Sequence, residues 1–304
     1  MNVNELKTYA AEYAARRRGE NLSPDTVTAI ESSARVLVSA LEEAKKNEIT
    51  PDAIRVARDA LAAKNKPSTV RLRMTVWHTM FERAEKEGRI DGNPVLPEDM
   101  PIVKQDEQTL LTENEIERLL SEDIEHMTPK RLETAVIVKF LLGTGLRRGE
   151  LIKVRLCDVD LDAGTVAVIK GKGGKNRLAP LPVPAADAVR LYLASGQRPA
   201  WAKPSAPLFG VESNGEWKPM IGESVRKRVR TYILDRTGKE LHPHSMRHAA
   251  ASLWDDLGVD MRDVQLALGH SSIKTTERVY VTVLNKGKSA AKINEKMARM
   301  AASK

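Results

Sequence analysis

Few features of this sequence suggest a secreted or membrane-bound protein. The chain contains one cysteine, Cys157, which excludes an internal disulfide and is usual for a reducing cytosol. Its first residues lack the apolar segment of a secretion signal. The best apolar run, at residues 135–142, is interrupted by Lys139 and is too short to span a bilayer. These absences predict a cytoplasmic protein without a membrane partner.

Aromatic residues are scarce as well. They make up 4% of the 304 residues, whereas hydrophobic residues together reach 41%. That content is sufficient for one large domain or two ordinary ones. The cores must then consist mainly of Leu, Val, Ile, Ala and Met, as they do in helix-rich proteins.

The chain carries an excess of positive charge. Its net charge is +8 and its isoelectric point is about 9.5. The basic residues form clusters at 16–18, 71–73, 170–177 and 226–230. A basic protein favours a polyanionic partner, of which nucleic acid is the first candidate. Each cluster taken alone is equally well explained as a solvated helix face.

Helical patterns fill the first third of the chain. Two pairs of a hydroxyl residue and proline, at 23–24 and 50–51, place a capping side chain before the first helical position. Apolar residues follow both pairs at helical spacing, and they do so again over 68–88. We therefore predict a helical domain at residues 1–100. Prolines and charges interrupt the pattern after it, which predicts a linker at 101–111.

A second domain is predicted at residues 112–304. Thr112 and Glu115 form a capping box at the start of its first helix. Alternating apolar residues predict a small antiparallel sheet built from the segments 154–170 and 177–183. Further helical patterns occur at 132–142, 185–194, 223–234, 245–257 and 260–268. The expected fold is thus mainly α with a small antiparallel β-sheet.

Four segments of the second domain combine cations, imidazoles and a phenol. Cleavage of a phosphodiester without a metal ion needs cations that face the non-bridging oxygens, a nucleophile, and an acid for the departing 5′ oxygen. Guanidinium groups, a tyrosine and a lysine meet these needs, and imidazoles add hydrogen bonds or accept the tyrosine proton. The candidate catalytic residues are Arg147, Lys172, His244, Arg247, His270 and Tyr280.

The motifs around these residues resemble those of the tyrosine recombinase (phage integrase) family, in a layout close to Xer and phage-type integrases. Members carry, in this order, an arginine, a lysine, His-x-x-Arg, a histidine or tryptophan, and a tyrosine. This sequence keeps the order, and ten positions separate His270 from Tyr280 where many members have nine. The matching motifs are Thr-Gly-Leu-Arg at 144–147, Gly-Lys-Gly at 171–173, Pro-His-x-x-Arg-His at 243–248 and Leu-Gly-His-Ser-Ser at 268–272.

The resemblance implies a fold and a set of roles. It implies a C-shaped clamp on double-stranded DNA, with an N-terminal helical core-binding (SAM-like) domain and an α+β catalytic domain. Tyr280 would form a 3′-phosphotyrosine and Lys172 would protonate the 5′ oxygen, without metal, ATP or another cofactor. His244 would hydrogen-bond the phosphate or act as a base. The groups that would hold the scissile phosphate are Arg147, Arg247 and His270.

Neighbouring residues are expected to have supporting roles. We expect Glu150 to brace the first arginine or a histidine, and His248 to pack beside Arg247 as a structural residue. Basic residues of both domains are expected to grip DNA, mostly at its phosphates. These predicted contacts are Arg71, Arg73, Lys175, Arg177, Arg226, Lys227 and Arg230.

The end of the chain suggests an assembly. Apolar residues at 290, 293, 297 and 300 form a stripe on a predicted helix. In the family a tail segment often docks on a neighbouring protomer. We therefore expect residues 287–304 to link a homotetramer on two DNA duplexes, in preference to packing on their own domain. Accessory DNA-bending or directionality factors and association with the nucleoid are further expectations.

Other interpretations of the sequence are weaker. A zinc site at His242, His244 and His248 is disfavoured by the cation of Arg247 among them and by the lack of partner cysteines. The aspartates at 158–162 are not a calcium loop, because the glycine that follows them stands at the wrong offset. The sequence also has no Gly-x-x-x-x-Gly-Lys-Ser/Thr loop for ATP. The functional alternatives are a type IB topoisomerase, a non-catalytic DNA-binding protein and a metal-dependent nuclease. Dimer resolution, phage or mobile-element integration, and inversion are not distinguished.

Overall fold

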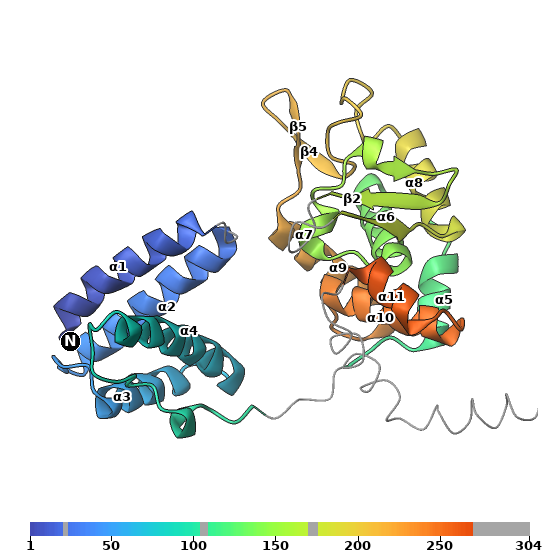
Figure 1. The fold of residues 1–304 in the computed structure, drawn as a ribbon. Helices are drawn as coiled ribbons and strands as arrows, with labels where there is room; N and C mark the ends of the chain where they lie inside the picture. Colours follow the sequence, from blue (N-terminus) through green and yellow to red (C-terminus); the bar gives the residue numbers. More distant parts are fainter. Residues whose placement is uncertain (21–23, 104–108, 170–175, 270–304) are drawn as a thin grey trace, which may run out of the picture. The chain divides into compact units, whose positions relative to one another are not determined.

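The computed structural model describes residues 1–20, 24–103, 109–169 and 176–269. The chain forms two compact units, which are divided between Asp106 and Glu107 (Figure 1). This division lies inside the segment 101–111 that the sequence predicts as a linker. Each unit has a hydrophobic core of its own.

The N-terminal unit is built from helices, and side chains cap the starts of the first and the third. Asn2 accepts a hydrogen bond from the backbone N–H of Glu5 at 2.9 Å, and Thr50 accepts one from Ala53 at 3.2 Å. The described elements are α1 (Val3–Gly19), α2 (Pro24–Glu43), α3 (Pro51–Ala62), α4 (Pro67–Lys86) and the 3₁₀ turn η1 (Pro97–Asp99). The predicted helices α2 to α4 are confirmed, whereas α1 was not predicted.

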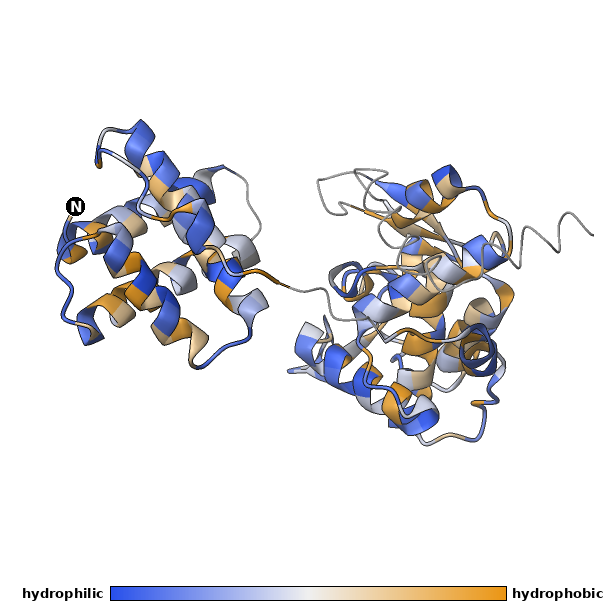
Figure 2. Cartoon of the chain, turned by 90° about the horizontal axis from the view of Figure 1, so that it is seen from below, coloured by the Kyte–Doolittle hydropathy of each residue, from blue (hydrophilic) through white to orange (hydrophobic). Residues whose placement is uncertain are grey.

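The apolar stripes predicted for these helices form the core of the N-terminal unit. Leu37 of α2, Ile54 of α3, and Trp77 and Phe81 of α4 are fully buried. The indole N–H of Trp77 donates to the carbonyl of Ser33 at 2.8 Å, so its polar atom is not left unpaired. Figure 2 shows that apolar residues lie on the inward faces of the helices in each unit.

Helix α6 forms the centre of the C-terminal unit. Its residues 132–144 are all buried, because α8, α9 and α10 pack around it. The apolar run around Lys139 therefore belongs to a core helix, and no helix among the described residues is long and apolar enough to cross a membrane. The helices of this unit are α5 (Glu113–Ser121), α6 (Pro129–Thr144), α7 (Arg148–Leu151), α8 (Val183–Ala194), α9 (Gly222–Thr237), α10 (Pro243–Asp256) and α11 (Met261–Leu268).

A three-stranded antiparallel sheet packs beside these helices. Its strands are β1 (Val159–Asp160), β2 (Thr165–Val168) and β3 (Arg177–Pro180), in the order β1-β2-β3. The expected sheet is confirmed, but its strands are shorter than predicted. The chain turns through the 3₁₀ segment η2 (Leu156–Asp158) before β1, and β3 ends at Pro180, shortly before α8 begins at Val183.

A second hairpin, formed by β4 (Gly210–Ser213) and β5 (Glu216–Pro219), was not predicted. Asn214 and Gly215 form its turn with positive φ angles of 55° and 73°, which is the pattern of a type I′ turn. Trp217 anchors the hairpin, since its indole N–H donates to the carbonyl of Pro207 at 2.9 Å.

Candidate active site

The candidate site begins at the turn that follows α6. Gly145 ends the helix in a left-handed conformation with φ 61°, and its N–H donates to the carbonyl of Leu141 at 3.0 Å. A Cβ atom at this position would lie 2.6 Å from the Cδ2 atom of Leu268 in α11. The glycine therefore allows the ends of α6 and α11 to meet, and Arg147 follows as the N-cap of α7.

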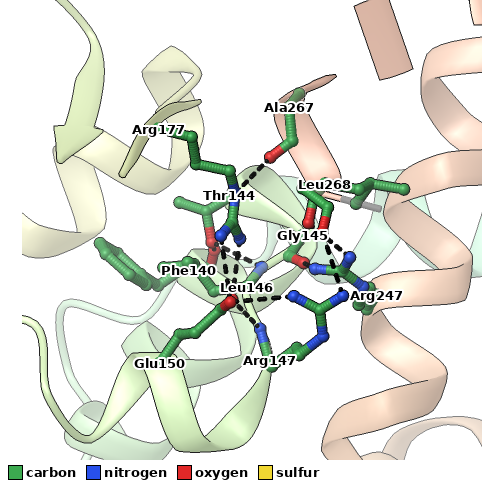
Figure 3. A network of polar contacts seen from close by, with 11 residues as sticks. Phe140, Thr144, Gly145, Leu146, Arg147, Glu150, Arg177, Arg247, Ala267 and Leu268 are labelled. Carbon is green, nitrogen blue, oxygen red and sulfur yellow. Dashed lines mark hydrogen bonds and ion pairs between the residues drawn. The ribbon is translucent and has the colours of Figure 1, made fainter. Parts of the chain in front are cut away.

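Arg147 is held by a carboxylate and a carbonyl. Its Nη1 atom donates to Oε1 of Glu150 at 3.0 Å, and its Nη2 atom donates to the carbonyl of Gly269 at 3.4 Å (Figure 3). Oε2 of Glu150 accepts the backbone N–H of Arg147 at 2.9 Å, which satisfies a donor at the start of α7. With 26% of its side chain exposed, Arg147 keeps an edge accessible to a ligand.

Arg247 of α10 lies beside Arg147 and is almost fully buried. Its Nη1 and Nη2 atoms donate to the carbonyls of Gly145 and Leu268 at 2.7 and 2.5 Å. Both carbonyls lie at helix C-termini, whose partial negative charge suits a cation. Burial, followed by the charge of Arg147, lowers the pKa of Arg247 to about 9. The group is therefore still protonated at neutral pH.

Arg177 of β3 joins this network, although the sequence predicted it as a DNA contact. Its Nη1 and Nη2 atoms donate to the two oxygens of Glu150 at 3.0 and 2.8 Å, and its Nε atom donates to the carbonyl of Ala267 at 2.8 Å. Only 11% of the side chain is exposed. The guanidinium is thus engaged inside the protein, a geometry that does not fit direct contact with DNA.

Glu150 is ionised although it is buried. Burial by itself raises the pKa of this carboxyl group. Hydrogen bonds from Arg177 and from the backbone of Arg147, together with the charges of both arginines, outweigh that effect and lower the pKa to about 2. The carboxylate contacts the first arginine of the motif and no histidine among the described residues.

Two imidazoles lie one turn apart on α10. The ring centroids of His244 and His248 are 4.5 Å apart, in an edge-to-face arrangement. Burial, followed by the charges of Arg247 and Arg147, lowers the pKa of His244, although the residue remains exposed on one side. Burial, followed by His244 and Arg247, lowers the pKa of His248 to about 4. Both shifts favour the neutral form of the ring, which can accept a proton or a hydrogen bond.

Several predicted site residues lie outside the described residues. These are Lys172, Lys175, His270, Tyr280 and the tail at 287–304. Two described segments that lie close to these residues in the sequence, the start of β3 and the end of α11, belong to the network around Glu150. Strand β3 begins at Arg177, shortly after Lys172 in the sequence, and α11 ends at Leu268, shortly before His270. The catalytic roles of these residues stay predictions.

Three of the other predicted DNA contacts lie on α9. Lys227 is exposed. Arg226 and Arg230 form surface ion pairs with Glu223 and Glu240 at 2.6 and 2.7 Å. Such surface pairs contribute little to stability, so a phosphate can replace the carboxylates at low cost.

The two predicted contacts on α4 are partly engaged within the N-terminal unit. Arg71 is exposed, and its Nη1 atom donates to the carbonyl of Pro101 at 2.8 Å. Arg73 is half-buried, and its Nη1 atom donates to the hydroxyls of Ser32 and Ser33 at 2.8 and 3.1 Å. Arg71 is therefore the more accessible of the two cations.

The described network carries more positive than negative charge. Three guanidiniums, those of Arg147, Arg177 and Arg247, surround the single carboxylate of Glu150. This excess in a partly buried place favours an anionic ligand. In the ranges that the structure describes, no His, Cys, Asp and Glu side chains are grouped so as to hold a metal ion.

Comparison with known proteins identifies the family. Residues 109–286 match the phage integrase family. Tyrosine recombinase XerA of Thermococcus kodakarensis is 34% identical over 224 residues, which cover 71% of this chain and 72% of that protein. Tyrosine recombinase XerD of Ralstonia nicotianae is 29% identical over 231 residues, which cover 72% and 71%. The chain therefore belongs to the phage integrase family and is a Xer-like tyrosine recombinase.

Solved structures share its fold. The Tn1549 transposon integrase in complex with transposon right end DNA has a TM-score of 0.69 at 21% identity, covering 92% of this chain and 95% of that one. A lambda integrase dimer bound to a COC′ core site has a TM-score of 0.69 at 16% identity, with the same coverage. The predicted fold class, mainly α with small antiparallel sheets, is thereby confirmed.

Proposed function

We propose that this recombinase cuts and rejoins DNA at specific sites through a covalent bond between Tyr280 and a 3′ phosphate. The supporting observation is the meeting of two arginines at the end of α11. Arg147 donates to the carbonyl of Gly269 and Arg247 to that of Leu268, although 100 positions separate the two arginines in the sequence. Guanidiniums gathered in this way match the negative charge of a phosphoryl-transfer transition state.

The proposed reaction has two transesterification steps. The phenolate oxygen of Tyr280 attacks the phosphorus atom, and the bond to the 5′ oxygen breaks. Lys172 gives that oxygen a proton, and His270 assists the arginines at the phosphate. The neutral ring of His244 accepts the phenol proton or hydrogen-bonds the phosphate. A 5′ hydroxyl of a partner duplex then attacks the phosphotyrosine, which rejoins the strand and releases Tyr280 without ATP or metal.

Double-stranded DNA is the proposed substrate. The structural relatives include a transposon integrase and a lambda integrase that are bound to DNA. Of the predicted DNA contacts, Arg226, Lys227 and Arg230 of α9 and Arg71 of α4 lie at the surface, where phosphates can reach them. The two units would bind the duplex together as a clamp, with an affinity that falls as salt rises.

The proposed active form is a homotetramer on two duplexes. The apolar stripe within residues 287–304 would dock on a neighbouring protomer, and accessory DNA-bending or directionality factors would act on the assembly. A lambda integrase tetramer bound to a Holliday junction is among the structures that share the fold. Xer recombinases are similar to this chain in sequence, which supports a Xer-like role.

A covalent capture experiment tests the proposed chemistry. Short nicked duplexes with random core sequences are incubated with the protein in EDTA, and DNA that stays attached in SDS is recovered and sequenced. We expect such adducts to form on a defined sequence, because the chemistry needs no metal. With the recovered duplex, the Tyr280→Phe variant should form no adduct, since it lacks the attacking oxygen.

Tyr192→Phe is the matched control for that variant. Tyr192 is fully buried in the core of the C-terminal unit, and its hydroxyl lies 3.5 Å from Glu133. Loss of this hydroxyl should leave adduct formation near the wild-type level. Adducts that form equally well with Tyr280→Phe, or a reaction that stops in EDTA, would contradict the proposal. A recombinase should exchange strands between two recovered duplexes, whereas a type IB topoisomerase should only reseal the strand that it cut.

A further inference from the structure

We propose that Arg177 is a positioning residue for Arg147 and does not bind DNA itself. This inference rests on the proposed function, because it assigns a partner to one of the arginines that would hold the phosphate. The sequence offered no sign of it, since the contact with Glu150 joins residues 27 positions apart on different elements. Three contacts of Arg177, together with the space left by a glycine, support the assignment.

The first support is the way in which Arg177 occupies Glu150. Its Nη1 and Nη2 atoms each donate a hydrogen bond to one oxygen of the carboxylate, at 3.0 and 2.8 Å. This two-pronged fork is a geometry that only a guanidinium can form. The side chain of Arg147 is left with a single hydrogen bond to the same carboxylate, at 3.0 Å. Without Arg177, Glu150 could take both terminal nitrogens of Arg147, which would turn that guanidinium away from a phosphate.

The second support is the contact with α11. The Nε atom of Arg177 donates to the carbonyl of Ala267 at 2.8 Å, one residue before the carbonyl that binds Arg247. Arg177 therefore joins strand β3 to the same helix end that anchors Arg147 and Arg247. One side chain thus fixes both the carboxylate and the main chain from which the two catalytic arginines take their positions.

The third support is the room that Gly269 leaves for this side chain. A Cβ atom on Gly269 would lie 2.9 Å from Cδ of Arg177 and 3.0 Å from its Nε atom. Gly269 also has φ 65°, a conformation that other residues adopt at a cost. The end of α11 is therefore shaped to let the stem of Arg177 pass over it.

The test compares two forms of the scissile phosphate. Arg177→Met keeps the length of the stem and removes the fork. On the duplex recovered by covalent capture, we expect its rate of adduct formation to fall roughly 10²-fold, as misplacement of a catalytic group does. A duplex with a neutral methylphosphonate at the scissile position carries no charge for Arg147 to balance. On that substrate the variant should come within roughly tenfold of the wild type.

Two further variants separate positioning from general stability. Arg236→Met is the matched control, because Arg236 has 14% of its side chain exposed and pairs with Glu122 at 2.8 Å in the same unit. Its rate of adduct formation relative to the wild type should be the same on the phosphate and on the methylphosphonate. Arg177→Lys keeps the charge but cannot make the fork, so its rate should also fall on the phosphate more than on the methylphosphonate. This variant replaces Arg177→Met if that protein fails to fold. An equal defect on both substrates, or none, overturns the inference.

A structural measurement decides the inference even if no adduct forms. In a crystal structure of Arg177→Met, or of Arg177→Lys, we expect both terminal nitrogens of Arg147 to bind Glu150. An Arg147 that keeps its single bond to the carboxylate and its contact with Gly269 would refute the positioning role. Failure of the wild-type protein to form any adduct would instead count against the proposed function alone.

Discussion

At the scale of single residues, the charge of the site depends on Glu150. This carboxylate is buried, yet it stays ionised because two arginines share it. A buried ion pair is not in itself a source of stability, since desolvation offsets much of the attraction. Its effect here is geometric, because the carboxylate determines where the two guanidiniums lie.

The pH dependence of stability should reveal this residue. The folded-state pKa of Glu150 is about 2, below its ordinary value of 4.5, so its contribution is present above pH 4.5 and is lost as the pH falls toward 2. The stability difference between the wild type and Glu150→Gln should therefore shrink by about 3 kcal/mol between pH 7 and pH 2. Urea unfolding, monitored by hydrogen-exchange mass spectrometry of peptides from the C-terminal unit, measures this difference in stability. A difference that does not change with pH would contradict the assignment.

The motifs of the sequence predicted which side chains gather, but not the partner of each. Arg147, Glu150 and Arg247 were identified because short motifs carry them in a recognisable order. Arg177 was predicted to contact DNA because it lies in the basic cluster at 170–177, and such a cluster gives no indication of an internal partner. Its contacts with Glu150 and Ala267 arise only when β3 and α11 pack together. Such tertiary contacts leave no local pattern in a single sequence.

At the scale of elements, a glycine turn holds the site together. Gly145→Ala should destabilise the C-terminal unit by roughly 2–4 kcal/mol, because a left-handed residue gains a Cβ atom that collides with Leu268. Gly196→Ala is the control, since Gly196 has φ 73° but no atom within 4 Å of the added Cβ. It should cost only about 1 kcal/mol. Equal losses in urea unfolding of the two variants would show that the collision is absent.

Local signals predicted the helices better than the strands. Proline at the first position marked α2 and α3, and the capping box of Thr112 marked α5. The sheet was located, but its strands were drawn too long, because alternation continues through the 3₁₀ segment η2. The β4–β5 hairpin was missed, although the Asn214–Gly215 pair is a strong turn signal. Its strands are short and mostly exposed, so they lack an apolar pattern.

At the scale of the whole molecule, the two units have separate cores. The interruption of the helical pattern at 101–111 predicted two domains, and the apolar residues of 3–100 and of 111–249 form distinct buried clusters. We expect residues 1–106 to fold alone, with helical circular dichroism and one cooperative urea transition. Trp77, the one tryptophan of this unit, is fully buried, so its emission should shift to longer wavelength in the same transition. A gradual change without a transition would show that the unit depends on the rest of the chain.

The way in which Arg247 is bound has a consequence for how the protein can change. Its two partners are peptide oxygens of Gly145 and Leu268, atoms that every amino acid carries. A substitution at either position changes the side chain but keeps the carbonyl oxygen, so it does not directly remove the hydrogen bond to Arg247. The guanidinium loses its place only when the course of the main chain itself is altered, which makes its position as durable as the fold.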